Sequence, residues 1–110
     1  MEMHGTVKGG VYETLPTTHY FDSAIFEREK TRIFQRCWQL AGHVSDIPNQ
    51  GDFFVADISG KSIVVLRGKD DIVRGFYNVC IHRGHELLTG KGCVNHIICP
   101  YHAWMYDTTG

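Results

Sequence analysis

Short runs of apolar and aromatic residues, bounded by Gly, Asp and Ser, fill the chain from residue 38 onward and predict a mainly β protein of small antiparallel sheets. The predicted strands lie at residues 38–43, 52–58, 61–66, 72–79, 97–99 and 103–107. Ser59 and Gly60 form a two-residue loop that suits a tight hairpin, and residues 68–71 form the next turn. Gly75, inside a predicted strand, indicates a bulge or a close backbone approach.

A different spacing, with apolar residues three and four positions apart, precedes the strands and predicts one helix over residues 22–36. Asp22 suits the N-cap of this helix, and Phe21 and Phe26 stand at the two positions of a hydrophobic staple. Cys37 falls on the same apolar stripe as Phe26, so we expect it to be a small buried apolar residue.

Residues 1–20 are rich in Gly and Thr and are predicted to form an extended leader. The remaining residues, 21–110, are predicted to form one domain with a modest core. Trp38, Phe53 and Phe54 are expected in that core, because aromatic residues at such positions usually serve packing.

The composition argues against several classes of function. The formal net charge is −1, which does not suit a nucleic-acid-binding surface. The longest apolar runs, such as residues 63–66, are too short to cross a membrane. The first ten residues lack the apolar segment of a signal peptide, and the four cysteines have better uses than disulfides. We therefore expect a cytoplasmic protein.

Two short loops hold the residues with metal-binding chemistry. Cys80 and His82 are followed, after sixteen intervening residues, by Cys99 and His102, so each loop supplies one thiolate and one imidazole. Two Cys and two His suit either a Rieske 2Fe-2S centre or a structural zinc site. Zinc sites usually pair Cys with Cys and His with His, whereas each loop here holds one of each. This mixed pairing favours one 2Fe-2S cluster, in which both loops reach both irons.

The sequence around the loops is similar to a known family. The runs Asn-Val-Cys-Ile-His-Arg-Gly-His-Glu-Leu-Leu at 78–88 and Cys-Pro-Tyr-His-Ala-Trp-Met-Tyr-Asp at 99–107 resemble the N-terminal Rieske domain of ring-hydroxylating-type oxygenase alpha subunits. The resemblance spans about residues 12–110. The His-Glu-Leu-Leu after the first loop is most similar to the branch that oxidises quaternary ammonium compounds such as glycine betaine, choline or carnitine. Ala103 and Met105 replace the Gly and Thr of many members, at positions that bind no metal.

This resemblance implies a Rieske-type fold, in which a cluster-binding subdomain of two hairpin loops follows one N-terminal helix. It implies a domain that accepts electrons from a reductase or ferredoxin and passes them to a mononuclear non-haem Fe(II), which activates O2 for hydroxylation or N-demethylation. That iron would lie in the catalytic domain of the same or a neighbouring subunit of a trimer. The chain ends in a predicted turn at 107–110, so we expect a C-terminally truncated mono- or dioxygenase that lacks the oxygenation site and has no catalytic residue of its own.

A free-standing Rieske ferredoxin is the alternative function. The predicted helix at 22–36 favours the oxygenase, because ferredoxins of this type begin directly with a sheet. Respiratory-chain Rieske proteins carry one extra Cys in each loop and join the loops by a disulfide. His85 and Tyr101 stand at those positions here, so no such disulfide is possible. His85 either forms a hydrogen bond near the cluster or is an ordinary loop histidine.

Other residues near the loops have less specific roles. Trp104 and Tyr106 are expected to shield the cluster from water, with ordinary core packing as the alternative for Tyr106. Arg83 and Glu86 either form an ion pair at the loop edge or face a partner domain. His96 precedes a strand and is interpreted as structural.

Overall fold

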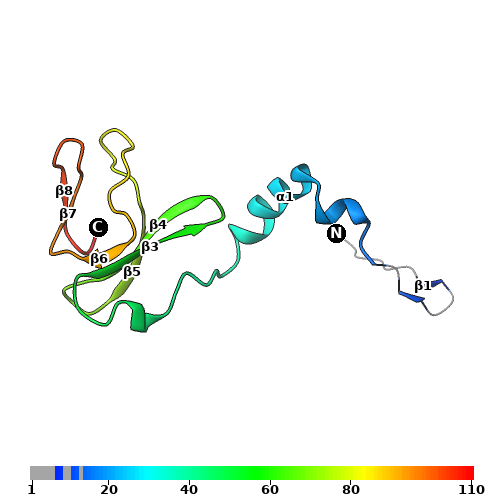
Figure 1. Ribbon diagram of the computed structural model, residues 1–110, viewed down its shortest axis with the longest axis horizontal. Coiled ribbons are helices and arrows are strands. Elements are labelled where there is room, and N and C mark those ends of the chain that lie inside the picture. Colours follow the sequence, from blue (N-terminus) through cyan, green and yellow to red (C-terminus); the bar gives the residue numbers. More distant parts are fainter. Residues whose placement is uncertain (1–6, 9–10, 13) are drawn as a thin grey trace. The chain divides into compact units, whose positions relative to one another are not determined.

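The computed structural model describes residues 7–8, 11–12 and 14–110. Internal contacts divide the chain into two compact units, Met1–Cys37 and Trp38–Gly110 (Figure 1). The predicted start of the domain at residue 21 stays a prediction. Within the described residues, no helix has both the length and the apolar character that crossing a membrane requires.

The first unit begins with a short β pair. Strand β1 (Val7–Lys8) pairs antiparallel with β2 (Val11–Tyr12), and a 3-10 turn, η1, spans Thr17–Tyr20. The turn forms because His19 N–H donates to the backbone oxygen of Pro16 at 3.0 Å, and the extended leader at 1–20 stays a prediction. The rest of the predicted leader, at 1–6, 9–10 and 13, lies outside the described residues.

Helix α1 (Ser23–Glu29) begins where the sequence predicts, because a backbone N–H of its first turn donates to Asp22 Oδ1 at 2.8 Å. The α-helical geometry does not continue to residue 36. A π-helical turn, η2 (Lys30–Phe34), follows directly. Thr31 lies in this turn, and its hydroxyl donates to the backbone oxygen of Arg28 at 3.1 Å. Such a side-chain bond competes with the regular helical hydrogen bonds and bends the helix.

Several apolar side chains of the first unit are exposed, among them Phe21, Phe26 and Ile33. The rings of Phe26 and Phe34 lie 6.5 Å apart between centroids, and Lys30 Nζ lies 5.3 Å from the centre of the Phe26 ring. The staple contact between Phe21 and Phe26 stays a prediction. Cys37 is exposed, so the prediction of a buried cysteine is wrong. The reason is that no residue of α1 or η2 is buried, so the stripe forms no core.

A four-stranded antiparallel sheet frames the second unit, in the order β5–β4–β3–β6. Its strands are β3 (Asp52–Ile58), β4 (Lys61–Arg67), β5 (Val73–Tyr77) and β6 (Lys91–Cys93). Ser59 and Gly60 join β3 to β4 with φ angles of 54° and 77°. Two successive left-handed residues form the turn that closes a two-residue hairpin, so this prediction is confirmed.

Two predictions about strands are wrong. Gly75 pairs with Val65 in an uninterrupted β4–β5 ladder, and a Cβ added to Gly75 would meet only Ile63, at an ordinary 3.6 Å. Gly75 therefore forms neither a bulge nor a close approach. Residues 38–43 form no strand, and Trp38 is fully exposed instead of buried. A segment forms a β-strand only when its backbone N–H and C=O groups can bond to a neighbouring strand. Within the described residues, no strand lies beside residues 38–43.

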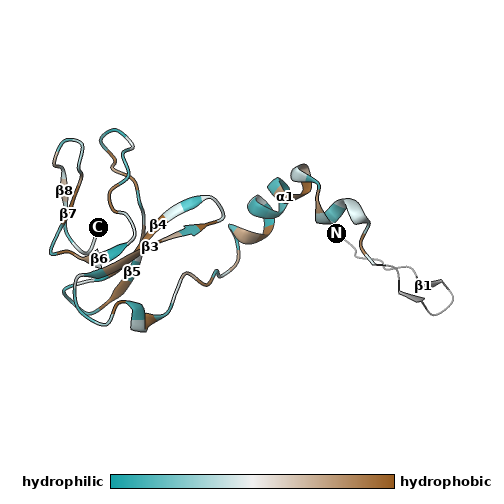
Figure 2. Cartoon of the chain, in the orientation of Figure 1, coloured by the Kyte–Doolittle hydropathy of each residue, from teal (hydrophilic) through white to brown (hydrophobic). Residues whose placement is uncertain are grey.

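The hydrophobic core lies against one face of the main sheet, whose strands include many hydrophobic residues (brown in Figure 2). Its buried members are Phe53, Val64, Leu66 and Ile97. Phe53 pairs with Leu66, and alternation along β4 places Val64 on the same face. Phe54 projects to the opposite face, where it is half-buried against Gly42. The prediction of core packing is therefore confirmed in full for Phe53 only.

A second antiparallel sheet has two short strands, β7 (Ile97–Ile98) and β8 (Met105–Tyr106). They lie inside the strands predicted at 97–99 and 103–107. The observed strands are shorter because the residues between them form a closed loop. Tyr106 and Ile97 both pack in the core, so the small sheet shares the core of the main sheet.

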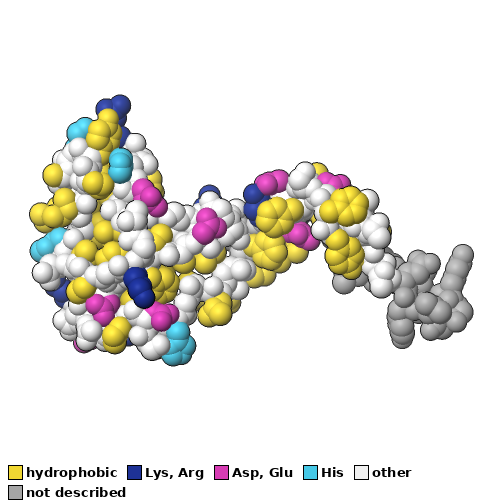
Figure 3. All heavy atoms as spheres, viewed as in Figure 1, with side chains coloured by type: hydrophobic (Ala, Val, Ile, Leu, Met, Phe, Trp, Pro, Cys, Tyr) yellow, Lys and Arg dark blue, Asp and Glu magenta, His cyan; other side chains and the backbone are white. Residues whose placement is uncertain are grey.

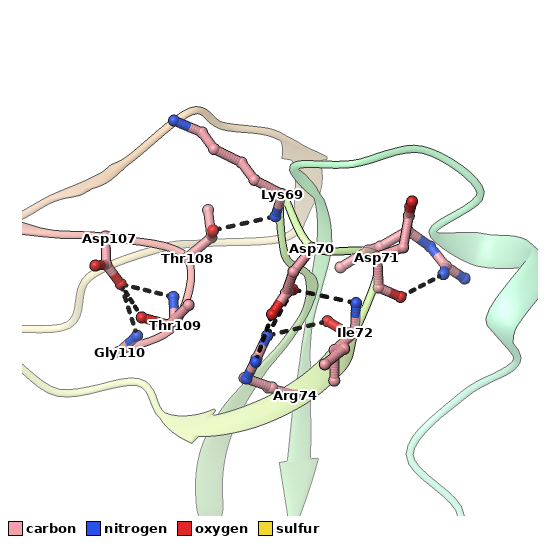
Figure 4. A network of polar contacts seen from close by, with 10 residues as sticks. Lys69, Asp70, Asp71, Ile72, Arg74, Asp107, Thr108, Thr109 and Gly110 are labelled. Atoms are coloured by element: carbon pink, nitrogen blue, oxygen red, sulfur yellow. Dashed lines mark hydrogen bonds and ion pairs between the residues drawn. The ribbon is translucent and has the colours of Figure 1, made fainter.

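The predicted turn at 107–110 is present and is anchored to the main sheet (Figure 4). Gly110 N–H donates to the backbone oxygen of Asp107 at 3.3 Å. The buried Thr108 accepts a hydrogen bond at its Oγ1 from Lys69 N–H, at 3.3 Å, in the turn between β4 and β5. This contact ties the end of β8 to the main sheet.

Candidate metal centre

The first ligand loop, residues 78–90, connects β5 to β6 (Figure 1). Its tip closes on itself, because Cys80 N–H donates to the backbone oxygen of His85 and Gly84 N–H donates to that of Cys80, both at 2.8 Å. Gly84 has a φ of 72°, a left-handed conformation that glycine adopts at little cost. His82 therefore lies within a tightly closed turn that begins at Cys80.

The second ligand loop, residues 99–104, connects β7 to β8 and repeats this backbone pattern. Cys99 N–H donates to the backbone oxygen of Trp104 at 2.8 Å, and Ala103 N–H donates to that of Cys99 at 2.9 Å. Ala103 has a φ of 59°, so it takes the place that Gly84 has in the first loop. A residue with a Cβ pays about 1–2 kcal/mol in this conformation. The replacement of the expected glycine by Ala103 therefore strains the loop.

The two loops bring the four predicted ligands together as a pair of thiols and a pair of imidazoles. Cys80 and Cys99 are each 2% exposed, and the Cys99 side chain lies beside that of Cys80. The rings of His82 and His102 lie edge to face, with 4.8 Å between centroids, and both are exposed. Figure 3 shows histidine side chains at the surface of this unit, beside apolar ones. The sulfur donors are therefore inside and the nitrogen donors face outward.

Tyr106 joins the two loops at the sulfur pair. Its hydroxyl oxygen lies 3.1 Å from Cys80 Sγ and accepts a hydrogen bond from Ile81 N–H at 3.2 Å. Because the oxygen accepts from Ile81, its own hydrogen is free to point at the sulfur. The hydrogen bond from Tyr106 lowers the pKa of the Cys80 thiol, and the same contact raises the pKa of Tyr106. The site thus favours a thiolate at Cys80, the form that binds metals.

Aromatic rings surround the imidazoles. The Trp104 ring stacks on that of His82, with 4.7 Å between centroids and 7° between planes. The rings of His85 and Tyr101 lie 5.6 Å apart, and the Arg83 guanidinium lies 5.7 Å from the centre of the Tyr101 ring. His85 and Tyr101 are the positions of the loop disulfide in respiratory-chain Rieske proteins. Ring contacts therefore link the loop tips where those proteins have a covalent bond.

The charged residues near the first loop do not pair with each other. Glu86 Oε1 accepts hydrogen bonds from Ser62 Oγ at 3.2 Å and from Asn78 Nδ2 at 3.1 Å. Of the two interpretations of Arg83 and Glu86, the ion pair is absent from the described residues. His85 Nδ1 lies 2.6 Å from the backbone oxygen of Glu86.

The arrangement of donors fits a two-metal cluster. Across residues 14–110 and the other described positions, no group of three or more His, Cys, Asp and Glu side chains is placed to hold one metal ion. The four donors instead divide into two sulfurs and two nitrogens. This division suits two irons with one kind of ligand each, and it does not suit one zinc ion held by all four.

A comparison with family models decides the family. The model of the Rieske [2Fe-2S] domain matches residues 37–110. The chain belongs to this family. Members carry a 2Fe-2S cluster, so the cofactor predicted from the sequence is confirmed.

Relatives and solved structures agree with this family. The chain is 45% identical over 98 residues to the carnitine monooxygenase oxygenase subunit of Escherichia coli (strain K12), a match that covers 88% of this chain and 26% of that protein. It is 39% identical to the glycine betaine monooxygenase oxygenase subunit of Pseudomonas aeruginosa (strain UCBPP-PA14), covering 88% and 23%. The chain spans about a quarter of the length of the curated relatives it matches.

Two solved structures show the same fold. The apo form of the quaternary ammonium Rieske monooxygenase CntA matches with a TM-score of 0.85 and 46% identity, over 88% of this chain and 29% of that chain. Naphthalene 1,2-dioxygenase from Rhodococcus sp. matches with a TM-score of 0.77 and 38% identity, over 81% and 20%. The predicted mainly β Rieske-type fold and the resemblance to oxygenase alpha subunits are confirmed.

Two residues in this Rieske domain have roles that the sequence analysis missed or left open. Tyr106 was assigned either to shielding or to core packing, and the structure shows a direct contact with Cys80. Asn78 was not singled out, although it is 4% exposed and hydrogen-bonded to the first ligand loop. Its signal in the sequence is a polar residue between the apolar Tyr77 and Val79, two positions before the first ligand.

Proposed function

We propose that this chain is the Rieske electron-transfer domain of an oxygenase alpha subunit, with Cys80 and Cys99 on one iron and His82 and His102 on the other. When bound, the cluster accepts and donates one electron at a time. The observation that carries this proposal is the division of the donors into a buried thiol pair and an exposed imidazole pair. The thiols are protected from water, and the imidazoles are accessible to a partner.

The exposed imidazoles are the proposed contact with the oxygen-activating domain. A metal-bound histidine usually donates its other ring N–H to a carboxylate or a carbonyl group. His82 and His102 lie on the outer side of the sulfur pair, so each ring is able to donate to a partner. We propose that a carboxylate of the catalytic domain, in the same or a neighbouring subunit of a trimer, accepts this hydrogen bond.

The wider proposal is an oxygenase that takes electrons from a reductase or ferredoxin and delivers them to a mononuclear Fe(II), for hydroxylation or N-demethylation of a quaternary ammonium compound. The similarity to carnitine and glycine betaine monooxygenase subunits supports this substrate class. A structural study of a quaternary ammonium Rieske monooxygenase describes inter-subunit electron transfer in that protein. The 98 matched residues extend beyond the domain at 37–110, which favours an oxygenase over a free-standing ferredoxin. None of the four cysteines forms a disulfide, which supports a reducing compartment such as the cytoplasm.

Replacement of one imidazole tests the assignment of ligands. In the His102→Ala variant, one iron loses a protein ligand, so we expect loss of the visible absorption and of the electron paramagnetic resonance (EPR) signal of the reduced cluster. The matched control is His96→Ala, which removes an exposed histidine of the same unit. The control should keep both signals. An unchanged spectrum in His102→Ala would reject His102 as a ligand.

A further inference from the structure

A buried amide closes the base of the first ligand loop. Asn78 Oδ1 accepts hydrogen bonds from Leu87 N–H at 3.1 Å and from Leu88 N–H at 2.9 Å. Asn78 Nδ2 donates to the backbone oxygen of Leu88 at 2.7 Å. The same nitrogen contacts Ser62 Oγ and Glu86 Oε1, each at 3.1 Å. The Asn78 side chain therefore joins the start of the loop to its far side and to strand β4.

The chemistry of these contacts requires an amide. An amide oxygen accepts two hydrogen bonds and an amide nitrogen donates two, and the partners of Asn78 divide in this way. Leu88 takes one hydrogen of the nitrogen, and Ser62 and Glu86 share the other. A carboxylate in this place would turn a second acceptor toward the backbone oxygen of Leu88 and toward Glu86. Burial at 4% exposure makes any unpaired group costly.

The hydrogen bonds of the Asn78 side chain to Leu87, Leu88, Ser62 and Glu86, here called the clamp, lie next to the metal centre. Asn78 lies two residues before Cys80, and Leu87 lies two residues after His85, where the closed turn ends. The clamp therefore fixes both ends of the segment that carries Cys80 and His82. None of these hydrogen bonds uses a side chain of a proposed metal ligand, so none of them is given up when the cluster binds.

We propose that Asn78 is a positioning residue that holds the first ligand loop in its binding conformation before the cluster is inserted. This inference rests on the proposed function, because it takes Cys80 and His82 as ligands. Leu87 and Leu88 contribute through their backbone N–H groups, and their side chains pack against the core. The clamp thus couples the ligand loop to the rigid part of the domain.

The first test is amide hydrogen exchange of the full chain after removal of the cluster. If the loop is preformed, the Leu87 and Leu88 amides of the apoprotein exchange more slowly than exposed loop amides by at least about 100-fold, as buried hydrogen bonds do. Fast exchange at Leu87 and Leu88, whether confined to the loop or spread through the chain, would overturn the proposal. This measurement does not depend on which residues bind iron. An incorrect assignment of the first loop would appear separately, as a normal EPR signal in His82→Ala.

The second test compares two isosteric substitutions. Asn78→Asp removes the two amide hydrogens that Asn78 donates. Asn95→Asp makes the same change at an exposed residue of the same unit. We expect Asn78→Asp to lose iron to a chelator at least about 10-fold faster than the wild type. A tenfold change in rate corresponds to the free energy of about one hydrogen bond to a charged or buried group. Its EPR spectrum should also broaden, while Asn95→Asp matches the wild type. Equal rates and spectra for all three proteins would overturn the proposal.

A milder variant keeps this test decisive if Asn78→Asp does not fold. Ser62→Ala removes one outer contact of the amide and leaves its bonds to Leu87 and Leu88. We expect iron loss about 2- to 5-fold faster than in the wild type, with an unchanged circular dichroism spectrum. No change in the rate of iron loss would contradict a clamp that runs through Ser62.

Discussion

The hydroxyl group of Tyr106 should raise the reduction potential of the cluster, and Tyr106→Phe removes only that oxygen. In the structure the oxygen lies 3.1 Å from Cys80 Sγ and accepts from Ile81 N–H. When Cys80 is a metal-bound thiolate it can only accept, so the hydroxyl hydrogen then points at the sulfur. Reduction adds one electron, which makes the sulfur more negative and strengthens a hydrogen bond to it. Removal of the donor should destabilise the reduced state more than the oxidised state.

The size of the effect follows from the change in strength of one hydrogen bond. A hydrogen bond between neutral groups contributes about 0.5–1.5 kcal/mol, and one to a charged group about 1.5–3 kcal/mol. The two redox states therefore differ by about 1 kcal/mol in the strength of this bond. For a one-electron couple, about 1.4 kcal/mol corresponds to about 59 mV. We expect Tyr106→Phe to lower the potential by about 40 mV.

Redox titration followed by EPR gives the midpoint potential directly. The matched control is Tyr77→Phe, which removes a hydroxyl from an exposed tyrosine of β5. The control should keep the wild-type potential. A potential of Tyr106→Phe that is equal to or higher than that of the wild type would refute the reasoning, because it would show that the hydroxyl does not stabilise the reduced state.

Two further predictions concern stability. Ala103→Gly should raise the melting temperature slightly, because glycine relieves about 1–2 kcal/mol of left-handed strain at a φ of 59° and loses only part of it to chain entropy. A lower melting temperature would contradict this account. Asp70→Asn should lower stability near neutral pH, because the Arg74 hydrogen bonds depress the pKa of Asp70 from 3.8 to about 2 (Figure 4). The stabilisation is complete above pH 3.8 and disappears as the pH falls toward 2, so unfolding curves of variant and wild type should converge there. A difference that persists at pH 2 would exclude this ion pair as the cause.

Features encoded by neighbouring residues were predictable. Cys80 and His82 lie within one loop and Cys99 and His102 within another, so the proposed donor set followed from the sequence. The turn at Ser59 and Gly60 is also local, because two left-handed residues between alternating strands define a hairpin. Asp22 was identified as an N-cap for the same reason.

Features that depend on a distant partner were not predictable in this way. The apolar residues at 38–43 resemble those of a true strand, but no neighbouring strand is present within the described residues. Apolar spacing likewise placed Cys37 in a core that the first unit does not form.

The sequence by itself determined which residues we propose as metal ligands, because two Cys and two His in mixed pairs are a property of composition and spacing. Only the tertiary structure decided how those residues are supported. The contact between Tyr106 and Cys80 spans 26 residues of the chain, and that between Asn78 and Ser62 spans 16. The physical reason is that a hydrogen bond between distant segments forms only after the sheet has set their positions. The pattern of neighbouring residues does not indicate which distant residues will then lie within hydrogen-bond distance.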